Sequence, residues 1–341
     1  MLKGIQSARG IAALMVVAYH AERTFALPQY LSVFTLDGVT GFGHAGVDFF
    51  FILSGFIIYL VHHGDIGQPS ALPRYLLKRI TRIYPPYWAV TLLIIAISLR
   101  VHDLPSGSEI VHSLLLLPGN PPPILGVAWT LVSEVRFYLL FAIAIISLRW
   151  AFVVAALVVG IGILPLPAWT DDLQAWGASR YDTQFVAGVG VAWLTLHRSL
   201  RYPGVVAIFA AATFIAVGLA ENAGLFSGDS VTARLAFGVP AGLLIWGLAQ
   251  TEQSGLLRVP PALVMLGAAS YSIYLVHSPV LGYAARGLAA IGVLGIVPGW
   301  AGLGIGAGIA VGAGIAFHHA VERPLTAFFS ARRSKALTKL T

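Results

Sequence analysis

Ten long apolar segments divide the chain, and the short stretches between them carry most of its charges. Within each segment the apolar residues run on without alternating with polar ones. A continuous apolar run of roughly 20 residues can cross a bilayer as an α-helix, whereas the strands of a membrane β-barrel alternate. The pattern therefore predicts an all-α integral membrane protein with about ten transmembrane helices. The expected spans are 9–27, 43–62, 82–100, 129–147, 150–165, 180–197, 202–220, 232–250, 267–288 and 297–320.

Composition strengthens this prediction. Of the 341 residues, 57% are hydrophobic and only 10% are charged, against about 25% charged residues in a typical soluble domain. The chain contains no cysteine, which excludes disulfides, thiolate catalysis and cysteine-ligated zinc.

The distribution of charge predicts an orientation. The net charge is +7, from 21 Lys and Arg against 14 Asp and Glu. If the N-terminus is cytoplasmic and the spans alternate, 15 of the 21 basic residues lie at cytoplasmic ends of spans and five at outer ends. Cytoplasmic loops of membrane proteins collect Lys and Arg, so we expect both termini in the cytoplasm and no nucleic-acid partner. Residues 1–325 would form one transmembrane domain, 326–341 a short basic tail, and 28–43, 101–128 and 166–179 the largest outer connections.

Polar residues inside the spans are the candidates for function, because a charge in the bilayer is costly. Arg9 and His20 are eleven residues apart, which places both on one face of the first helix and about 16 Å apart along its axis. For an isolated pair, a snorkelling arginine and a histidine satisfied by packing would be the preferred interpretation. Arg79 and Arg82 share a helix face at the start of the third span. They could hold an anionic group such as a phosphate, or simply anchor the helix at the cytoplasmic surface.

Three further spans carry polar groups. Asp48 lies near the outer end of the second span, where it could cap the helix, and Ser54-Gly55 would allow close approach of another backbone. Glu134 lies about one and a half turns into the fourth span and could act as a base, orient a histidine or form a structural ion pair. Arg136 would point away from it, toward another span or a lipid headgroup. His277 lies in the ninth span, before a proline that could kink the helix.

Two patterns near the C-terminus favour a structural role over metal or nucleotide binding. His318, His319 and Glu322 do not have the usual spacing of metal ligands, so no metal is expected. Glycines four residues apart in the last span indicate close helix packing, not a nucleotide-binding loop.

Six motifs occur in order over nearly the whole chain, and together they resemble the acyltransferase-3 family of integral-membrane O-acyltransferases, which acylate cell-surface sugars and some small molecules. The motifs are Arg9–x10–His20, Phe50-Phe51-x-x-Ser54-Gly55, Arg79-x-x-Arg82 with Ile83 and Pro85, Trp129-Thr130-Leu131-x-x-Glu134-x-x-Phe137-Tyr138, Ser272-Ile273-Tyr274-x-x-His277 and Val321-Glu322-x-Pro324. The chain departs from the family pattern at Thr130, where many members have serine, and at Arg136. Its stand-alone form looks most similar to exopolysaccharide acetyltransferases of the succinoglycan type.

The resemblance implies a bacterial cytoplasmic-membrane enzyme that moves an acyl group, most often acetyl, from cytoplasmic acyl-CoA to a carbohydrate hydroxyl. Arg9, Arg79 and Arg82 would bind the phosphates of acetyl-CoA. His20 would act as general base or as a nucleophile that carries the acyl group, and Glu134 would orient His20 or deprotonate the acceptor. Supporting roles are expected for Asp48, Ser54, Tyr138 and His277.

Two other functions fit the same intramembrane charges. One is a proton-coupled transporter or exporter of a polysaccharide or small molecule, although the chain has no inverted repeat of the kind that many transporters contain. The other is a non-catalytic subunit of a polysaccharide assembly complex, in which His20 and Glu134 would tolerate substitution. The acceptor, the length of the acyl group and the oligomeric state are not predicted by the sequence.

Overall fold

The computed structural model describes residues 2–101, 104–163, 181–228 and 230–338, and in these ranges every regular element is helical. Each of the ten predicted segments contains a long helix, which confirms the all-α class. The helices are α1 (Lys3–Phe25), α3 (Gly46–His62), α4 (Leu72–Val101), α6 (Trp129–Ile146), α7 (Leu148–Ile163), α9 (Asp182–His197), α10 (Pro203–Asn222), α11 (Val231–Gln253), α12 (Pro261–Ala290) and α13 (Gly299–Phe317). The predicted connection 166–179 lies outside the described residues.

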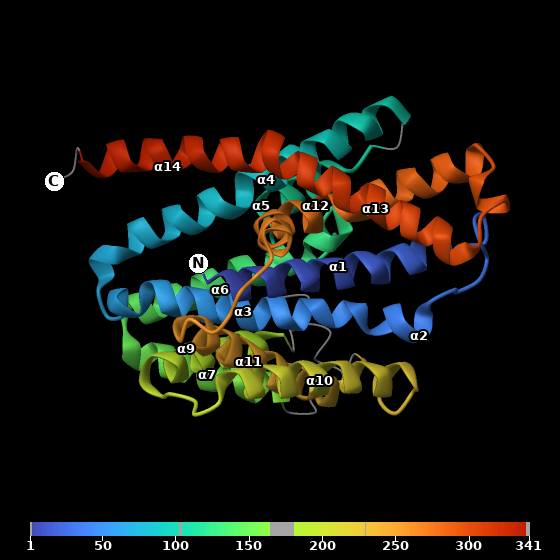
Figure 1. Ribbon diagram of the computed structural model, residues 1–341. Coiled ribbons are helices and arrows are strands. Elements are labelled where there is room, and N and C mark those ends of the chain that lie inside the picture. The colour runs from blue at the N-terminus through green and yellow to red at the C-terminus, as the bar shows by residue number, and fades with distance from the viewer. Residues whose placement is uncertain (1, 102–103, 164–180, 229, 339–341) are drawn as a thin grey trace.

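Seven helical stretches in the described ranges are long and apolar enough to cross a membrane. They are Asp37–Asp65, Pro69–Arg100, Gly126–Ile146, Pro203–Asn222, Val231–Gln253, Pro261–Ala290 and Gly299–Ala331. The charged helix α1 and the 16-residue helices α7 and α9 are not among the seven. The ten-span count therefore stays a prediction. The start of α1 and the end of α14 (Arg323–Thr338) point to the same side of the bundle (Figure 1).

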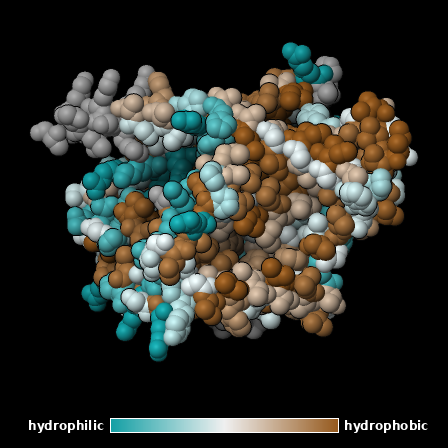
Figure 2. All heavy atoms as spheres, in the orientation of Figure 1, coloured by the Kyte–Doolittle hydropathy of each residue, from teal (hydrophilic) through white to brown (hydrophobic). Residues whose placement is uncertain are grey.

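Hydrophobic and hydrophilic residues are segregated along the bundle. Figure 2 shows hydrophobic side chains covering much of the right half of the visible face, while hydrophilic side chains gather at the left, around a hollow below α14. This separation is expected for a protein whose apolar helical surface faces lipid while its helix ends meet water.

Two segments differ from their expected form. The connection 101–128 contains a short helix, α5 (Gly107–Leu115), which begins with a capping box formed by Ser106 and Glu109. This connection folds back along α4: the side chains of Tyr84, Tyr87 and Trp88 donate hydrogen bonds to backbone carbonyls of residues 113–115. The chain also continues past α13 through a π-helical turn, His318–Glu322, into α14, so the expected tail is helical as far as Thr338.

Glycines bring several helices into backbone contact, as the sequence predicts. A Cβ atom added at Gly267 of α12 would lie 1.7 Å from the carbonyl oxygen of Gln6 in α1, and one at Gly55 of α3 would lie 2.1 Å from that of Phe185 in α9. Such distances exclude any side chain. On α13 the packing prediction holds for one face only, because Gly306 and Gly314 contact Phe25 and Ile273 while Gly308 faces open space.

Helix α1 lies in the middle of this arrangement and is fixed at both ends. At its start, the backbone N–H groups of Lys3 and Gly4 donate to the carboxylate of Glu252, which satisfies two of the donors that a helix N-terminus leaves free. At its end, Glu22 accepts hydrogen bonds from the backbone of Thr35 and Leu36 and so holds the following loop.

Candidate active site

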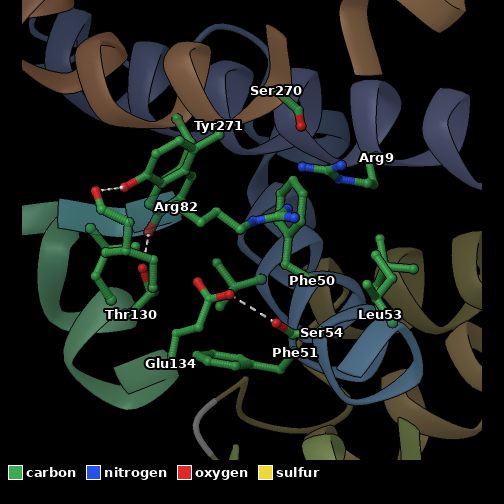
Figure 3. A pocket seen from close by; sticks show the side chains of 15 residues that line it. Arg9, Phe50, Phe51, Leu53, Ser54, Arg82, Thr130, Glu134, Ser270 and Tyr271 are labelled. Carbon is green, nitrogen blue, oxygen red and sulfur yellow. Dashed lines mark hydrogen bonds between the residues drawn. The ribbon is translucent and has the colours of Figure 1, made fainter. Parts of the chain in front are cut away.

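A pocket of about 100 Å³ lies where five helices meet. Arg9 comes from α1, Ser54 from α3, Arg82 from α4, Glu134 from α6 and Tyr271 from α12 (Figure 3). The fold thus gathers residues from five of the six motifs around one cavity. The remaining lining side chains are Val47, Phe50, Phe51, Leu53, Ile57, Ile83, Thr130, Leu131, Ser270 and Tyr274.

Two guanidinium groups and one carboxylate share this pocket. Arg9 and Arg82 point into it from different helices, and Glu134 enters from a third (Figure 3). The carboxylate interacts electrostatically with both arginines. Glu322, which does not line the pocket, also interacts electrostatically with both arginines. The Arg82 side chain is nevertheless exposed. Such a pocket can bind an anion.

Glu134 is held by hydroxyl groups. Its Oε1 accepts hydrogen bonds from Ser54 Oγ at 2.9 Å and from Tyr138 OH at 2.6 Å. Tyr138 lies one turn after Glu134 on α6, whereas Ser54 joins it from α3 across the pocket. Ser54 and Tyr138 are thus hydrogen-bond partners of Glu134, and their supporting role stays a prediction. Within the described residues no hydrogen bond joins Glu134 to His20.

A second polar group lies on α1 and α12. His277 is fully buried, and its Nε2 lies 3.3 Å from Nδ1 of His20. The two helices run parallel in a fixed register: Gly10 contacts Gly267, and His20 contacts His277 ten residues later on both helices. The sequence points to both histidines as candidates but not to their pairing.

The backbone partners of the two histidines define the position of the protons. Nδ1 of His277 lies 2.7 Å from the carbonyl oxygen of Tyr274, so Nδ1 carries the proton and Nε2 keeps a lone pair. Nδ1 of His20 faces this lone pair and also lies 2.9 Å from the carbonyl oxygen of Val16. Because both of these neighbours accept, the proton of a neutral His20 resides on Nδ1, and Nε2 is left as a free base.

Tyr274 connects the histidine pair to the pocket. Its side chain lines the pocket, its hydroxyl lies 2.9 Å from Thr130 Oγ1, and its ring centroid lies 5.5 Å from that of His277. Tyr271, one turn earlier, donates to the carbonyl oxygen of Ile83 at 2.8 Å. Sequence analysis assigned no role to either tyrosine. Their spacing of three residues, continued by His277, could have indicated a polar stripe on α12.

Arg79 and Asp48 lie outside this pocket. Arg79 lines a different cavity between α4 and α6, with its guanidinium 5.5 Å from the ring of Tyr138. Asp48 is fully buried and does not cap α3. Instead, both of its carboxylate oxygens accept from Arg234 of α11, at 2.7 and 2.6 Å, and Oδ1 also accepts from Gln184 of α9. It therefore links three helices at a distance from the predicted chemistry.

Two other ionisable groups have structural partners. Arg136 pairs with Asp182 of another helix, α9. Glu322 accepts from Ser272 and contacts His318. Among the described residues, no group of three or more His, Asp or Glu side chains is arranged to hold a metal ion.

Comparison with known proteins gives one family. The family described as "Acyltransferase domain" matches residues 2–319. The exopolysaccharide production protein ExoZ of Rhizobium meliloti is 31% identical over 74% of this chain and 80% of its own length. The acyltransferase MdmB of Streptomyces mycarofaciens is 29% identical over 98% of this chain and 94% of its own. The peptidoglycan O-acetyltransferase OatA of Listeria monocytogenes is 23% identical over 47% of this chain and 27% of its own. No solved structure matches.

Proposed function

We propose, because the chain belongs to the acyltransferase family that matches residues 2–319, that it transfers an acyl group from acyl-CoA to a hydroxyl of a surface or exported carbohydrate. Membership of the family and the apolar helices make it a membrane acyltransferase. The donor, the acceptor and the role of each residue are parts of the proposal. The observation that carries it is the convergence of Arg9, Arg82 and Glu134 on one pocket, which Tyr274 connects to the pair of His277 and His20.

Arg9 and Arg82 are proposed to bind phosphate groups of the donor. Both guanidinium groups are accessible from the pocket, and arginine binds phosphate with two parallel hydrogen bonds. A volume of about 100 Å³ is small beside the roughly 300–1,000 Å³ of pockets that enclose whole ligands of drug size. Only part of the donor would fit inside, and the remainder would extend toward the helix ends. The donor supplies an acyl group activated as a thioester.

His20 is proposed as the base. Its Nε2 takes the proton of the acceptor hydroxyl, whose oxygen then bonds to the acyl carbonyl carbon while the bond from carbon to sulfur breaks. The imidazolium ring returns the proton to the departing sulfur, so the charges balance and His20 is regenerated. A route in which Nε2 first takes the acyl group and then passes it on needs the same free nitrogen.

Glu134 is proposed to act through Arg9 and Arg82, and His277 is proposed to act through His20. Glu134 lies with Arg9 and Arg82, and its Oε1 already accepts two hydrogen bonds, so we assign it to orienting the arginines and not to deprotonating the acceptor. His277 shares the Nδ1 hydrogen of His20 with the carbonyl oxygen of Val16, and we propose that it stabilises the positive charge that forms when Nε2 is protonated.

The acceptor class rests on similarity to the relatives. The names of ExoZ and OatA refer to an exopolysaccharide and to peptidoglycan. A carbohydrate hydroxyl is therefore the proposed acceptor, and the bacterial cytoplasmic membrane, with both termini inside, is the proposed location.

The test is the content of ester-linked acyl groups in isolated surface polysaccharide. Four strains are compared: a deletion strain and the same strain restored with the wild type, with His20→Ala or with His197→Ala. His197 is exposed and, like His20, its Nδ1 contacts its own helix one turn back, so it is a matched control. We expect acylation to return with the wild type and His197→Ala only. Full acylation with His20→Ala would contradict the assignment of the base, and failed export with normal acylation of the residual polymer would favour a transporter.

A further inference from the structure

The cavity that contains Arg79 is distinct from the candidate active site. It has a volume of about 530 Å³ and is lined by α4, α6 and residues 115–118. Most of its lining is apolar, and two guanidinium groups, those of Arg79 and Arg136, reach it. Ile83 lines both this cavity and the pocket of Glu134.

Arg79 is buried without a counter-charge. Its side chain is only 7% exposed, and in the part of the chain that the structure describes it forms no hydrogen bond and no ion pair. Its Nε has no hydrogen-bond partner at all. Its guanidinium lies over the rings of Tyr75 and Tyr138, at 5.7 and 5.5 Å. Contacts with aromatic faces offset only part of the cost of burying a charge, so the site is incomplete without an anion.

Arg136 also lines this cavity, and it is only partly paired. One of its terminal nitrogens pairs with Asp182, but its Nε and Nη1 are buried without partners. These two nitrogens of Arg136 and the Nε of Arg79 are too deeply buried to face the cavity, so the donors that the cavity offers are the terminal nitrogens of Arg79. A phosphate group could accept hydrogen bonds from donors of this kind.

The rim of the cavity indicates what carries the phosphate. Ile80, Leu115 and Leu139 line it and are 49%, 51% and 57% exposed, and α4 and α6 both belong to stretches apolar enough to span a membrane. A basic pocket between transmembrane helices, bordered by apolar side chains that face lipid, suits a phospholipid headgroup whose acyl chains remain in the bilayer. A soluble phosphate compound would gain nothing from the apolar rim.

We propose that the cavity between α4 and α6 binds the phosphate of an anionic phospholipid through the terminal N–H groups of Arg79. This site does not depend on the proposed acyl transfer. It does touch the candidate active site, because the hydroxyl of Tyr138 bonds to Glu134 while its ring faces Arg79.

The experiment measures lipid retained by the purified full chain in detergent, using native mass spectrometry. The probes are phosphatidylglycerol and phosphatidylcholine with the same acyl chains, so only the headgroup charge differs. We expect the wild type to retain phosphatidylglycerol preferentially. Arg79→Ala should weaken its binding by about tenfold, as expected for loss of a hydrogen bond between charged groups. Arg201→Ala, which removes an exposed arginine that also lies near a tyrosine ring, should change nothing.

A second variant tests the same cavity in case Arg79→Ala does not fold. Leu139→Trp keeps both arginines and fills the cavity from its exposed rim, so it should also reduce retention of phosphatidylglycerol. Equal retention of the two lipids by the wild type would overturn the proposal, as would wild-type retention by both Arg79→Ala and Leu139→Trp. Displacement of the retained lipid by acetyl-CoA would instead assign the cavity to the donor and would also overturn it. Acyl transfer is not the readout, so failure here leaves the proposed function standing.

Discussion

The pairing of His277 with His20 predicts that replacing His277 changes the rate of acyl transfer. If His277 only fills space in α12, replacing it should affect stability and leave the reaction rate per folded molecule largely intact. If it holds the Nδ1 proton of His20, then His277→Ala should slow the reaction itself. The structure favours the second outcome, since the contact between Nε2 and Nδ1 is 3.3 Å and His277 is fully buried.

The size of the effect follows from the charge that His20 gains. In the transition state His20 is becoming an imidazolium, so the hydrogen bond to His277 is then a bond to a charged group. Such bonds contribute about 1.5–3 kcal/mol, which corresponds to a rate loss of roughly 10- to 150-fold. The loss should appear in kcat more than in KM for the acyl donor, because neither histidine lines the pocket of Arg9 and Arg82.

The assay is release of free CoA and formation of ester by purified protein in lipid nanodiscs, with the acceptor identified from the strain comparison. His277→Gln should retain more activity than His277→Ala, because the amide oxygen of glutamine can still accept a hydrogen bond from the Nδ1–H group of His20. His197→Ala is again the matched control. In the His20→Ala background, His277→Ala should cost little more, because residues that act as a unit are not additive.

Two results would refute this reasoning. One is an unchanged kcat for His277→Ala at normal thermal stability, since the contact would then contribute nothing to the reaction. The other is equal loss with His277→Ala and His277→Gln accompanied by a lower Tm, which would indicate a packing role.

Three further predictions concern packing and binding. Gly267→Ala should lower the Tm in detergent, because overpacking costs about 1–3 kcal/mol and the new Cβ would meet the backbone of α1, whereas Gly304→Ala, which faces open space, should not. Asp48→Asn should destabilise the fold by about 3–5 kcal/mol, since it leaves Arg234 buried without its counter-charge. Substituting both residues with apolar ones should recover stability. An Asp48→Asn protein no less stable than the wild type would contradict the pairing. Arg82→Ala should raise KM for the acyl donor about tenfold or more with a partial rescue by Arg82→Lys, and an unchanged KM would remove Arg82 from the phosphate site.

Hydrophobic patterning was sufficient to predict the helices. Each expected segment contains one, because an apolar run in a bilayer has no alternative that satisfies its backbone. The pattern was less informative where the chain is polar: it did not predict that 101–128 folds back along α4, a contact made by Tyr84, Tyr87 and Trp88 with backbone carbonyls.

The candidate site was predictable as a set of residues but not as a geometry. Arg79 and Arg82 share a helix face by spacing, yet three residues on an α-helix differ by about 60° in direction. That rotation is enough to place them in different cavities once α6 packs against α4. Asp48 likewise resembled a helix cap, because its partners, Gln184 and Arg234, lie more than 130 residues away in sequence.

The distance between the proposed phosphate-binding group and the proposed base is the one part of the site that the sequence determines alone. Arg9 and His20 lie on a single helix, so their separation of about 16 Å along the axis follows from the helical rise. Glu252 holds the start of α1, and Gly10 against Gly267 fixes its register with α12. A donor bound at Arg9 must therefore extend along α1 by that distance to reach His20. This requirement favours a donor with its anionic group at one end of a long arm and its acyl group at the other, as in acyl-CoA, over a compact acyl phosphate.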